Sequence, residues 1–272
     1  MKLSVWSSYY EDLSPEQALQ ELRAHGYAYC ELSDEHALAL MERGDPCEIG
    51  QRFGAFAREL GIELSQGHLF LGAKIGKAED RRLLKEQFKL FEAIGIRYAV
   101  LHCDRFADAV PALTQEELRE KNCEALAKLL EAVKGTSIVI CLENLRTNPI
   151  ARSADDLMFF IDRFQSEQLA ICLDTGHLNL TERDQAAFIR RAGKHIKALH
   201  IDDNEGKDAD SHLIPYGCGN VDIETVVREM KSLRYTGLYN LEIPGECIAP
   251  LEIRGYKLDY IQKVFSYLDA VT

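Results

Sequence analysis

The chain of 272 residues lacks several patterns that would place it in other classes of protein. None of its eight cysteines forms a CxxC pair, which excludes a thioredoxin-type motif and a zinc ribbon. It has no block of consecutive Lys and Arg residues, and its net charge of −12 disfavours nonspecific binding to a nucleic-acid backbone. It has no run of about 18 apolar residues, so we expect no membrane span.

The first residues, MKLSVWSSYYEDLSPEQ, also lack the long apolar segment of a secretory signal peptide. Cys30, Cys103, Cys141 and Cys172 fall inside apolar runs, where a free cysteine packs as a small core residue. These two features predict a protein of the reducing cytoplasm.

Short apolar runs alternate with amphipathic helical stretches along the whole chain. We predict eight strands, at residues 2–6, 27–32, 62–68, 98–103, 137–143, 169–174, 196–201 and 238–243. Residues that favour helix starts stand at Ser14, Thr114 and Ser153. Glycines that favour helix ends follow six of the helical stretches, at Gly26, Gly61, Gly95, Gly135, Gly193 and Gly237.

The strands are rich in Val, Ile, Leu and Cys with little polar alternation, as expected when other structure covers both faces. Eight such units with no linker predict one α/β domain over residues 1–272, a single (β/α)8 TIM barrel. A doubly wound open sheet is the alternative. It would normally carry a GxGxxG turn after the first strand, and WSSYYEDLSPE contains no glycine.

Each of the last four predicted strands has, at or next to its carboxyl end, a residue that suits a metal site. These residues are Glu143, Asp174, His200 and Glu242. The carboxyl ends of barrel strands meet at one mouth, so we expect these side chains to converge there. Three carboxylates and an imidazole suit Mn²⁺, Co²⁺, Mg²⁺ or Zn²⁺. A cation would also remove the repulsion between clustered carboxylates, which otherwise raises their pKa values.

Two long segments follow the third and seventh strands, QGHLFLGAKIGKAED and DDNEGKDADSHLIPYGCGNVD. Long loops on this side of a barrel carry its chemistry, so we expect both segments to border the mouth. His68 and His102 should reach the same place from the third and fourth strands. Asp202 and Asp203 are candidates to support His200 from behind.

The motifs LENLRTNP, LDTGH and LHIDDN, with the long segment that follows the last of them, resemble the xylose isomerase-like barrel superfamily. Its sugar (phosphate) isomerase and epimerase branch, which includes ketose 3-epimerases and inosose dehydratases, is the most similar. The resemblance implies one divalent metal held by Glu143, Asp174, His200 and Glu242. It also implies that Glu143 and Glu242 act as the acid and base, and that His177 binds a substrate hydroxyl.

A second branch of this superfamily, the zinc-dependent AP endonucleases, stays open as an alternative. Those enzymes hold three metals with nine ligands, and this chain offers a candidate for each. They are His68, His102, Glu143, Asp174, His177, His200, Asp210, His212 and Glu242. The acidic exit of the second unit, ELSDEHALALMERGDP, and the strong negative charge argue against a nuclease.

The predicted partner is therefore a small carbohydrate rather than nucleic acid or a membrane, and the chain is a candidate homo-oligomer. Trp6, His68 and Arg146 are further candidates for substrate binding, Trp6 by stacking on a sugar and Arg146 by pairing with an anionic group. Proton transfer next to a metal-polarised carbonyl fits isomerisation, epimerisation or dehydration. A protein that binds a metal without catalysis is disfavoured, because it has no need of two glutamates beside the ion.

Overall fold

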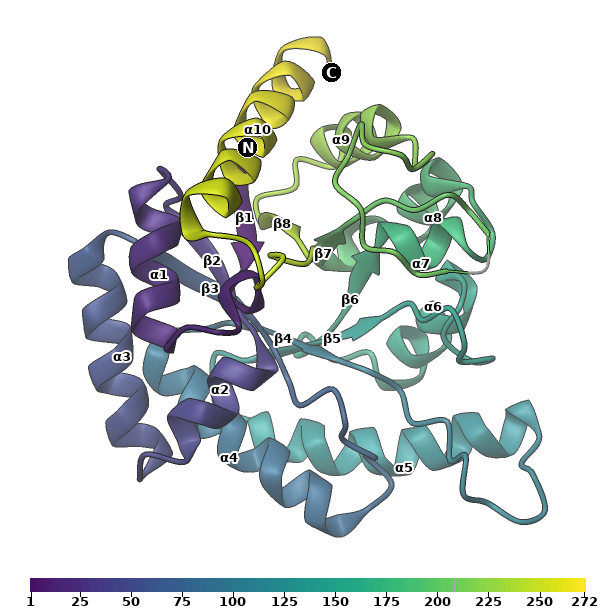
Figure 1. Cartoon of the computed structure of the whole chain (residues 1–272). Coiled ribbons are helices and arrows are strands. Elements are labelled where there is room, and N and C mark those ends of the chain that lie inside the picture. Colours follow the sequence, from purple (N-terminus) through teal and green to yellow (C-terminus); the bar gives the residue numbers. More distant parts are fainter. Residues whose placement is uncertain (208) are drawn as a thin grey trace.

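The computed structural model describes residues 1–207 and 209–272 and shows a closed barrel of eight parallel strands in sequence order (Figure 1). The predicted fold is confirmed. The strands are β1 Lys2–Trp6, β2 Tyr29–Leu32, β3 Glu63–His68, β4 Tyr98–Leu101, β5 Val139–Glu143, β6 Leu169–Asp174, β7 Ile196–Ile201 and β8 Leu238–Leu241. The predicted strands are longer by one or two residues in five cases, at the start of β2, β3 and β5 and at the end of β4 and β8, because the sequence pattern extends beyond the ladder hydrogen bonds.

Helices surround the strands (Figure 1). They are α1 Pro15–Ala24, α2 Asp34–Met41, α3 Pro46–Leu60, α4 Ala78–Ile94, α5 Gln115–Val133, α6 Ala154–Phe164, α7 Thr175–Asn179, α8 Gln185–Ala192, α9 Ile223–Ser232 and α10 Leu251–Val271. Two 3₁₀ turns, η1 Ser7–Tyr10 and η2 Gly193–His195, complete the chain.

The helix starts are fixed by local sequence. The side chains of Ser14, Thr114 and Ser153 each accept a hydrogen bond from the backbone N–H three residues on, and the backbone N–H of each donates to the side chain there in return. Five of the six expected glycines adopt a positive φ after their helices. The expectation for Gly237 is wrong, because α9 ends earlier and Arg234 takes the left-handed conformation instead.

The barrel interior is divided into an apolar and a polar part. Small apolar residues of β4 to β7 fill one part: Val100, Val139, Cys141, Ala170, Cys172 and Ala198. Polar residues of β1, β2, β3 and β8 fill the other: Ser4, Glu31, Gln66 and Asn240, all fully buried. Gln66 Nε2 donates to Glu31 Oε2 at 2.7 Å, Asn240 Nδ2 donates to the same oxygen, and Ser4 Oγ donates to Asn240. These bonds link the four polar side chains to one another, while Gln66 Oε1 has no partner among the described residues.

Arg254, near the start of α10, joins this helix to the loop after β1. Its side chain is buried, donates to Tyr9 O at 2.6 Å and Asp12 Oδ2 at 3.0 Å, and lies over the ring of Tyr10 at 4.4 Å. The same helix meets the first residue, since the Met1 amino group is 3.9 Å from Asp269. Together these contacts hold the first and last units of the barrel together.

Replacing Arg254 by Ala should lower the free energy of unfolding by about 2–3 kcal/mol, because the Tyr9 carbonyl loses a buried donor and Tyr10 loses packing. Urea unfolding followed by circular dichroism measures the change. Arg228→Ala, which removes an exposed guanidinium from α9, is the control and should change stability by less than about 0.5 kcal/mol. Equal losses in the two variants would contradict the role assigned to Arg254.

Candidate active site

The four predicted metal ligands meet at the carboxyl ends of β5 to β8. Glu143 and Asp174 end their strands, His200 is the penultimate residue of β7, and Glu242 directly follows β8. One nitrogen or oxygen atom from each lies within 4.8 Å of the others, and all four side chains are buried. The barrel thus brings together residues that are separated by up to a hundred positions in the chain.

Three atoms of this cluster are buried without a hydrogen-bond partner among the described residues: Asp174 Oδ2, His200 Nδ1 and Glu242 Oε2. His200 Nδ1 is 2.9 Å from Glu242 Oε2, so the two atoms are close although they do not have hydrogen-bond geometry. Buried polar atoms without partners are costly. A divalent cation between them would satisfy all three, so the residues present fit a metal site.

Glu31 of β2 sets the orientation of His200, a contact that was not predicted from the sequence. Both of its carboxylate oxygens lie 3.1 Å from His200 Nε2. Because a carboxylate accepts a hydrogen bond, Nε2 carries a hydrogen, and Nδ1 is the nitrogen that faces the cluster and could bind a cation in place of a proton. A glutamate inside the apolar run YCEL was the signal that could have revealed it, since an unpaired carboxylate is rarely buried.

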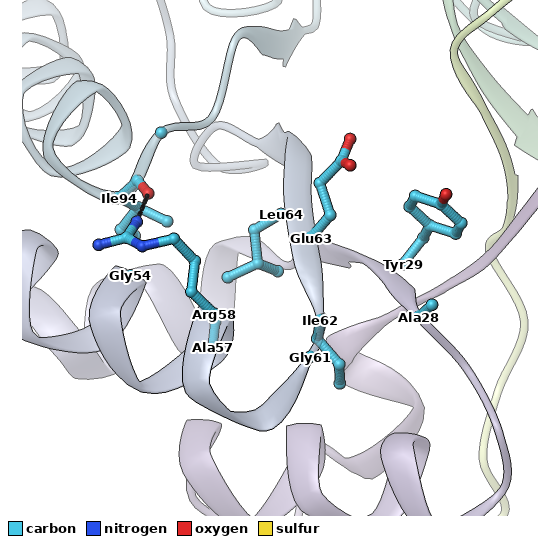
Figure 2. A pocket seen from close by; sticks show the side chains of 11 residues that line it. Ala28, Tyr29, Gly54, Ala57, Arg58, Gly61, Ile62, Glu63, Leu64 and Ile94 are labelled. Carbon is cyan, nitrogen blue, oxygen red and sulfur yellow. Dashed lines mark hydrogen bonds between the residues drawn. The ribbon is translucent and has the colours of Figure 1, made fainter.

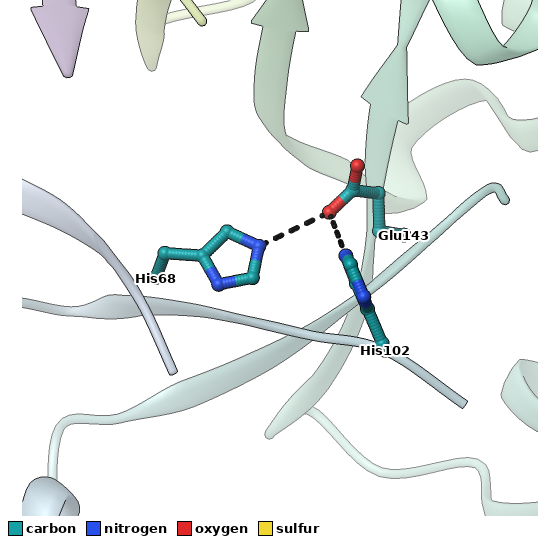
Figure 3. Close-up of side chains that lie close together, drawn as sticks. All are labelled: His68, His102 and Glu143. Carbon is teal, nitrogen blue, oxygen red and sulfur yellow. Dashed lines mark hydrogen bonds and ion pairs between the residues drawn. The ribbon is translucent and has the colours of Figure 1, made fainter. Parts of the chain in front are cut away.

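Glu143 is surrounded by four imidazoles. Its Oε2 lies 3.0 Å from His102 Nε2 and 3.3 Å from His68 Nε2 (Figure 3). Its Oε1 lies 3.3 Å from His177 Nδ1 and 3.4 Å from His200 Nδ1. Burial alone would raise the pKa of Glu143, but the positive charges of His200 and His102 hold it well below its usual value. Glu143 is therefore ionised at neutral pH.

The other two carboxylates differ from each other. Burial raises the pKa of Asp174 well above its usual value, and the nearby carboxylate of Asp202 raises it further. Burial also acts on Glu242, but His200 outweighs it and lowers the pKa of Glu242. The expected raised pKa therefore occurs only at Asp174, where burial is the main cause and repulsion by carboxylates adds to it, because the histidines lower the pKa of Glu143 and Glu242.

A further cluster lies at the outer edge of the site and contains His177, Asp210 and His212. His177 Nε2 is 2.9 Å from Asp210 Oδ2, and His212 Nε2 is 3.8 Å from Asp210 Oδ1. Burial would lower the pKa of His212, but its hydrogen bond with Asp202 raises it to about 11. Asp202 thus supports His212, at 2.9 Å from its Nδ1, rather than His200 as the sequence suggested.

The segments after β6 and β7 pack closely on one another. Thr175 Oγ1 donates to Asp202 O at 2.7 Å, and Asn204 Nδ2 donates to Gly176 O at 2.9 Å. A Cβ atom on Gly176 would lie 1.8 Å from Asp202 Oδ1. Only glycine therefore fits at this position of the LDTGH motif.

The mouth above these residues has two adjoining lobes that share Leu71, His102 and His177. The first, the catalytic lobe, has a volume of about 610 Å³, and its lining includes Trp6, Glu35, Glu143, His212, Glu242 and Glu246. The second, the cationic lobe, has a volume of about 530 Å³, and its lining includes Lys74, Asp104, Arg105, Arg146, Thr147 and Asp210. The segments after β3 and β7 contribute to both lobes, as expected for the two long loops.

The remaining substrate-binding candidates occupy different positions. Trp6 lines the catalytic lobe and donates its indole N–H to Ile243 O at 2.9 Å, and Arg146 lines the cationic lobe. His68 is only 1% exposed, donates from Nδ1 to Leu69 O at 2.6 Å and lies against Glu143. Contact of these three residues with a substrate stays a prediction.

A cavity of comparable size, about 530 Å³, lies at the opposite end of the barrel beside α3 and β3 (Figure 2). Its lining is mainly Gly, Ala, Ile and Leu, with Arg58 directed to Ile94 O at 3.4 Å. The candidate metal clusters found among the described residues all lie at the other end. We therefore place the active site at the carboxyl-terminal mouth.

The sequence model of the xylose isomerase-like TIM barrel family matches residues 19–264. The chain belongs to this family. The predicted resemblance is thus confirmed over nearly the whole chain.

Proteins named as sugar epimerases and as probable endonucleases are among the similar proteins. An L-ribulose 3-epimerase of Methylomonas sp. is 24% identical over 88% of this chain and 81% of its own. A probable endonuclease 4 of Mycoplasmopsis synoviae is 24% identical over 53% of this chain and 54% of its own. The matches cover about half the length of several of the curated relatives.

Solved structures of this family share the fold. A D-psicose 3-epimerase of Clostridium cellulolyticum H10, determined with D-tagatose, superimposes with a TM-score of 0.82 at 16% identity, covering 98% of this chain and 99% of that one. At this identity the likeness establishes the barrel alone. Among the described residues, the helices of this barrel are too short or too polar to cross a membrane.

Replacing Glu31 by Gln should weaken binding of Mn²⁺, Co²⁺ or Zn²⁺ about 10–100-fold, because the amide no longer holds His200 Nε2–H in place. Competition with a chromophoric chelator measures the affinity. Glu63→Gln, at an exposed position of β3, is the matched control and should bind as the wild type does. Unchanged affinity in Glu31→Gln, in a protein that stays folded, would refute the role of Glu31.

Proposed function

We propose that the chain is a divalent-metal-dependent sugar isomerase or epimerase, which moves a proton next to a carbonyl group of a small polyhydroxylated compound. One observation carries the proposal: Glu143 and Glu242 both line the catalytic lobe. They do so beside Asp174 and His200, which complete a set of ligand atoms within 4.8 Å of one another. The epimerase names among the relatives agree with this reading.

The metal would be held by Glu143, Asp174, His200 and Glu242, with Mn²⁺, Co²⁺, Mg²⁺ and Zn²⁺ all compatible with the donor set. When bound, it would supply Lewis-acid polarisation of the substrate carbonyl. The lone pair of His200 Nδ1 is available for it because Glu31 holds the opposite nitrogen. The raised pKa of Asp174 comes from burial first and from repulsion by nearby carboxylates second, and a cation would oppose both effects.

The two glutamates perform the proton transfer. One glutamate, as the carboxylate, accepts the proton from the carbon next to the carbonyl. The other must carry a proton when the substrate is bound, returns it to the opposite face in epimerisation and is left as the carboxylate. Dehydration would use the same pair, with the acid directed at a leaving hydroxyl. Glu143 remains ionised because its four imidazole neighbours favour the carboxylate.

The substrate would lie in the catalytic lobe with its hydroxyls toward His177 and His212. His177 Nδ1 is 2.9 Å from Asn144 O, which fixes the ring and directs Nε2 to the edge of the site. Trp6 offers an apolar ring surface at the same lobe, suited to the C–H face of a sugar.

A second candidate, a zinc-dependent phosphodiester hydrolase of the AP endonuclease type, is favoured by one observation. Besides the four-residue cluster, His68, His102 and Glu143 form a group, and so do His177, Asp210 and His212. The Nδ1 atoms of His68, His177 and His212 each lie at hydrogen-bond distance from a backbone carbonyl oxygen. The Nε2 atom of each ring then faces a carboxylate. Such fixed imidazoles suit further metal ions. The acidic lining of the catalytic lobe disfavours a DNA substrate.

Glu242→Gln should reduce metal-dependent exchange of a ketose C–H with D₂O about 10²–10⁴-fold, since an amide cannot accept the proton. Proton NMR of a panel of ketoses in D₂O follows the exchange. Glu131→Gln on the exposed surface of α5 is the control. Retained exchange in Glu242→Gln would remove this residue from the mechanism.

The number of metal ions separates the two candidate functions. We expect one tightly held divalent ion per chain after dialysis, measured by mass spectrometry of the elements, and an abasic-site DNA duplex that stays uncleaved. Three tightly held ions, together with cleavage that is lost in Glu143→Gln, would replace the proposed function with the hydrolase.

A further inference from the structure

The charged residues of the mouth are segregated between its lobes. The catalytic lobe is lined by Glu11, Glu35 and Glu246 in addition to Glu143 and Glu242, and no Lys or Arg occurs among its described lining residues. The cationic lobe is lined by Lys74, Arg105 and Arg146. In a chain with 44 acidic and 32 basic residues, the lining of this cavity of about 530 Å³ combines three cations with two carboxylates, Asp104 and Asp210.

The acidic residues of the cationic lobe already have partners. Asp104 accepts hydrogen bonds from the backbone of Gly76 at 3.0 Å and Phe106 at 2.8 Å. Asp210 faces His177 Nε2 at 2.9 Å. These carboxylates are therefore held by the loop backbone and by the site histidine, so they compensate the cations of the lobe only in part.

The Arg105 guanidinium has more N–H donors than its hydrogen bond to Thr147 uses. Its Nη1 donates to Thr147 Oγ1 at 3.2 Å, and a guanidinium carries five N–H donors in a planar fork that matches phosphate and carboxylate oxygens. Lys74 pairs with Asp108 at 2.6 Å, but both side chains are exposed, and an exposed pair exchanges readily for another anion. The Thr147 hydroxyl adds a neutral donor beside Arg105.

The lobe is continuous with the reaction site, because His102 and His177 line both lobes and both contact Glu143. A molecule in the catalytic lobe can therefore extend a charged end past these two imidazoles toward Arg105. This arrangement orients the molecule, because the acidic catalytic lobe repels an anionic end and the cationic lobe attracts it.

We propose that the cationic lobe binds a terminal phosphoryl group of the substrate, with Arg105 as the main donor and Lys74, Arg146 and Thr147 at its sides. The inference rests on the proposed function and narrows its substrate class from sugars in general to phosphorylated polyhydroxy carbonyl compounds. Arg105 thereby acts as a specificity-determining residue, and the proton transfer stays with Glu143 and Glu242.

Binding of inorganic phosphate to the metal-free protein, followed by calorimetry in phosphate-free buffer at low salt, tests the lobe without any turnover. Wild type should bind one phosphate saturably, and Arg105→Ala should bind it at least about tenfold more weakly, since a charge-assisted pair of hydrogen bonds is lost. Arg105→Lys should be intermediate, because it keeps the charge and loses the fork. Arg228→Ala on α9 is the matched control and should bind as wild type does.

Competition identifies the source of the phosphoryl group. D-fructose 6-phosphate should displace inorganic phosphate at concentrations where D-fructose does not. No saturable binding by wild type, equal binding by Arg105→Ala, or displacement by a DNA duplex in preference to the sugar phosphate would each overturn the proposal. Phosphate binding that depends on Arg105, without C–H exchange in any ketose or ketose phosphate, would instead reject the proposed function and leave the anion site in place.

Discussion

A buried carboxylate at the centre of the barrel is the constraint on which the site depends. Glu31 is fully buried, so each of its oxygens requires a donor. Asn240, Gln66 and His200 supply these donors from β8, β3 and β7. One side chain therefore links four strands directly beneath the reaction site. It also fixes the ring of His200, one of the four candidate metal ligands.

Above this base, the site balances imidazoles against carboxylates. Glu143 contacts four histidines and stays ionised, whereas Asp174 faces other carboxylates and is pushed toward its neutral form. The site therefore contains an ionised carboxylate, Glu143, close to a carboxyl group with a raised pKa, Asp174. A divalent cation would change this balance, because it favours the charged form of every carboxylate around it and the neutral form of His200.

Much of the fold could be predicted from the sequence, because its determinants are local. Capping residues such as Ser14 and Thr114 act within three positions, and the apolar runs define all eight strands. Glu143 and Asp174 could be predicted as site residues for the same reason, because the ends of the strands must share one mouth once the strands are known. Membership of the xylose isomerase-like family followed from motifs at those strand ends.

Features that arise between distant segments could not be predicted in this way. Nothing in YCEL shows that Glu31 meets His200, which lies 169 residues later. Asp202 was assigned to the adjacent His200, but the chain turns back and brings His212 to it instead. Arg105 stands in an irregular segment without periodicity, so only the folded loop shows that it shares a cavity with Lys74 and Arg146.

The close packing of Gly176 on Asp202 has a consequence for how such barrels diversify. Because the segments after β6 and β7 exchange hydrogen bonds and leave no space for a side chain between them, neither is an independent module. A β7 loop transplanted from a relative would fit only if its backbone followed the same path against Gly176 or if it arrived with its own β6 segment. New specificity in this barrel is therefore more accessible through the loops after β3 and β4, which border the mouth outside this contact.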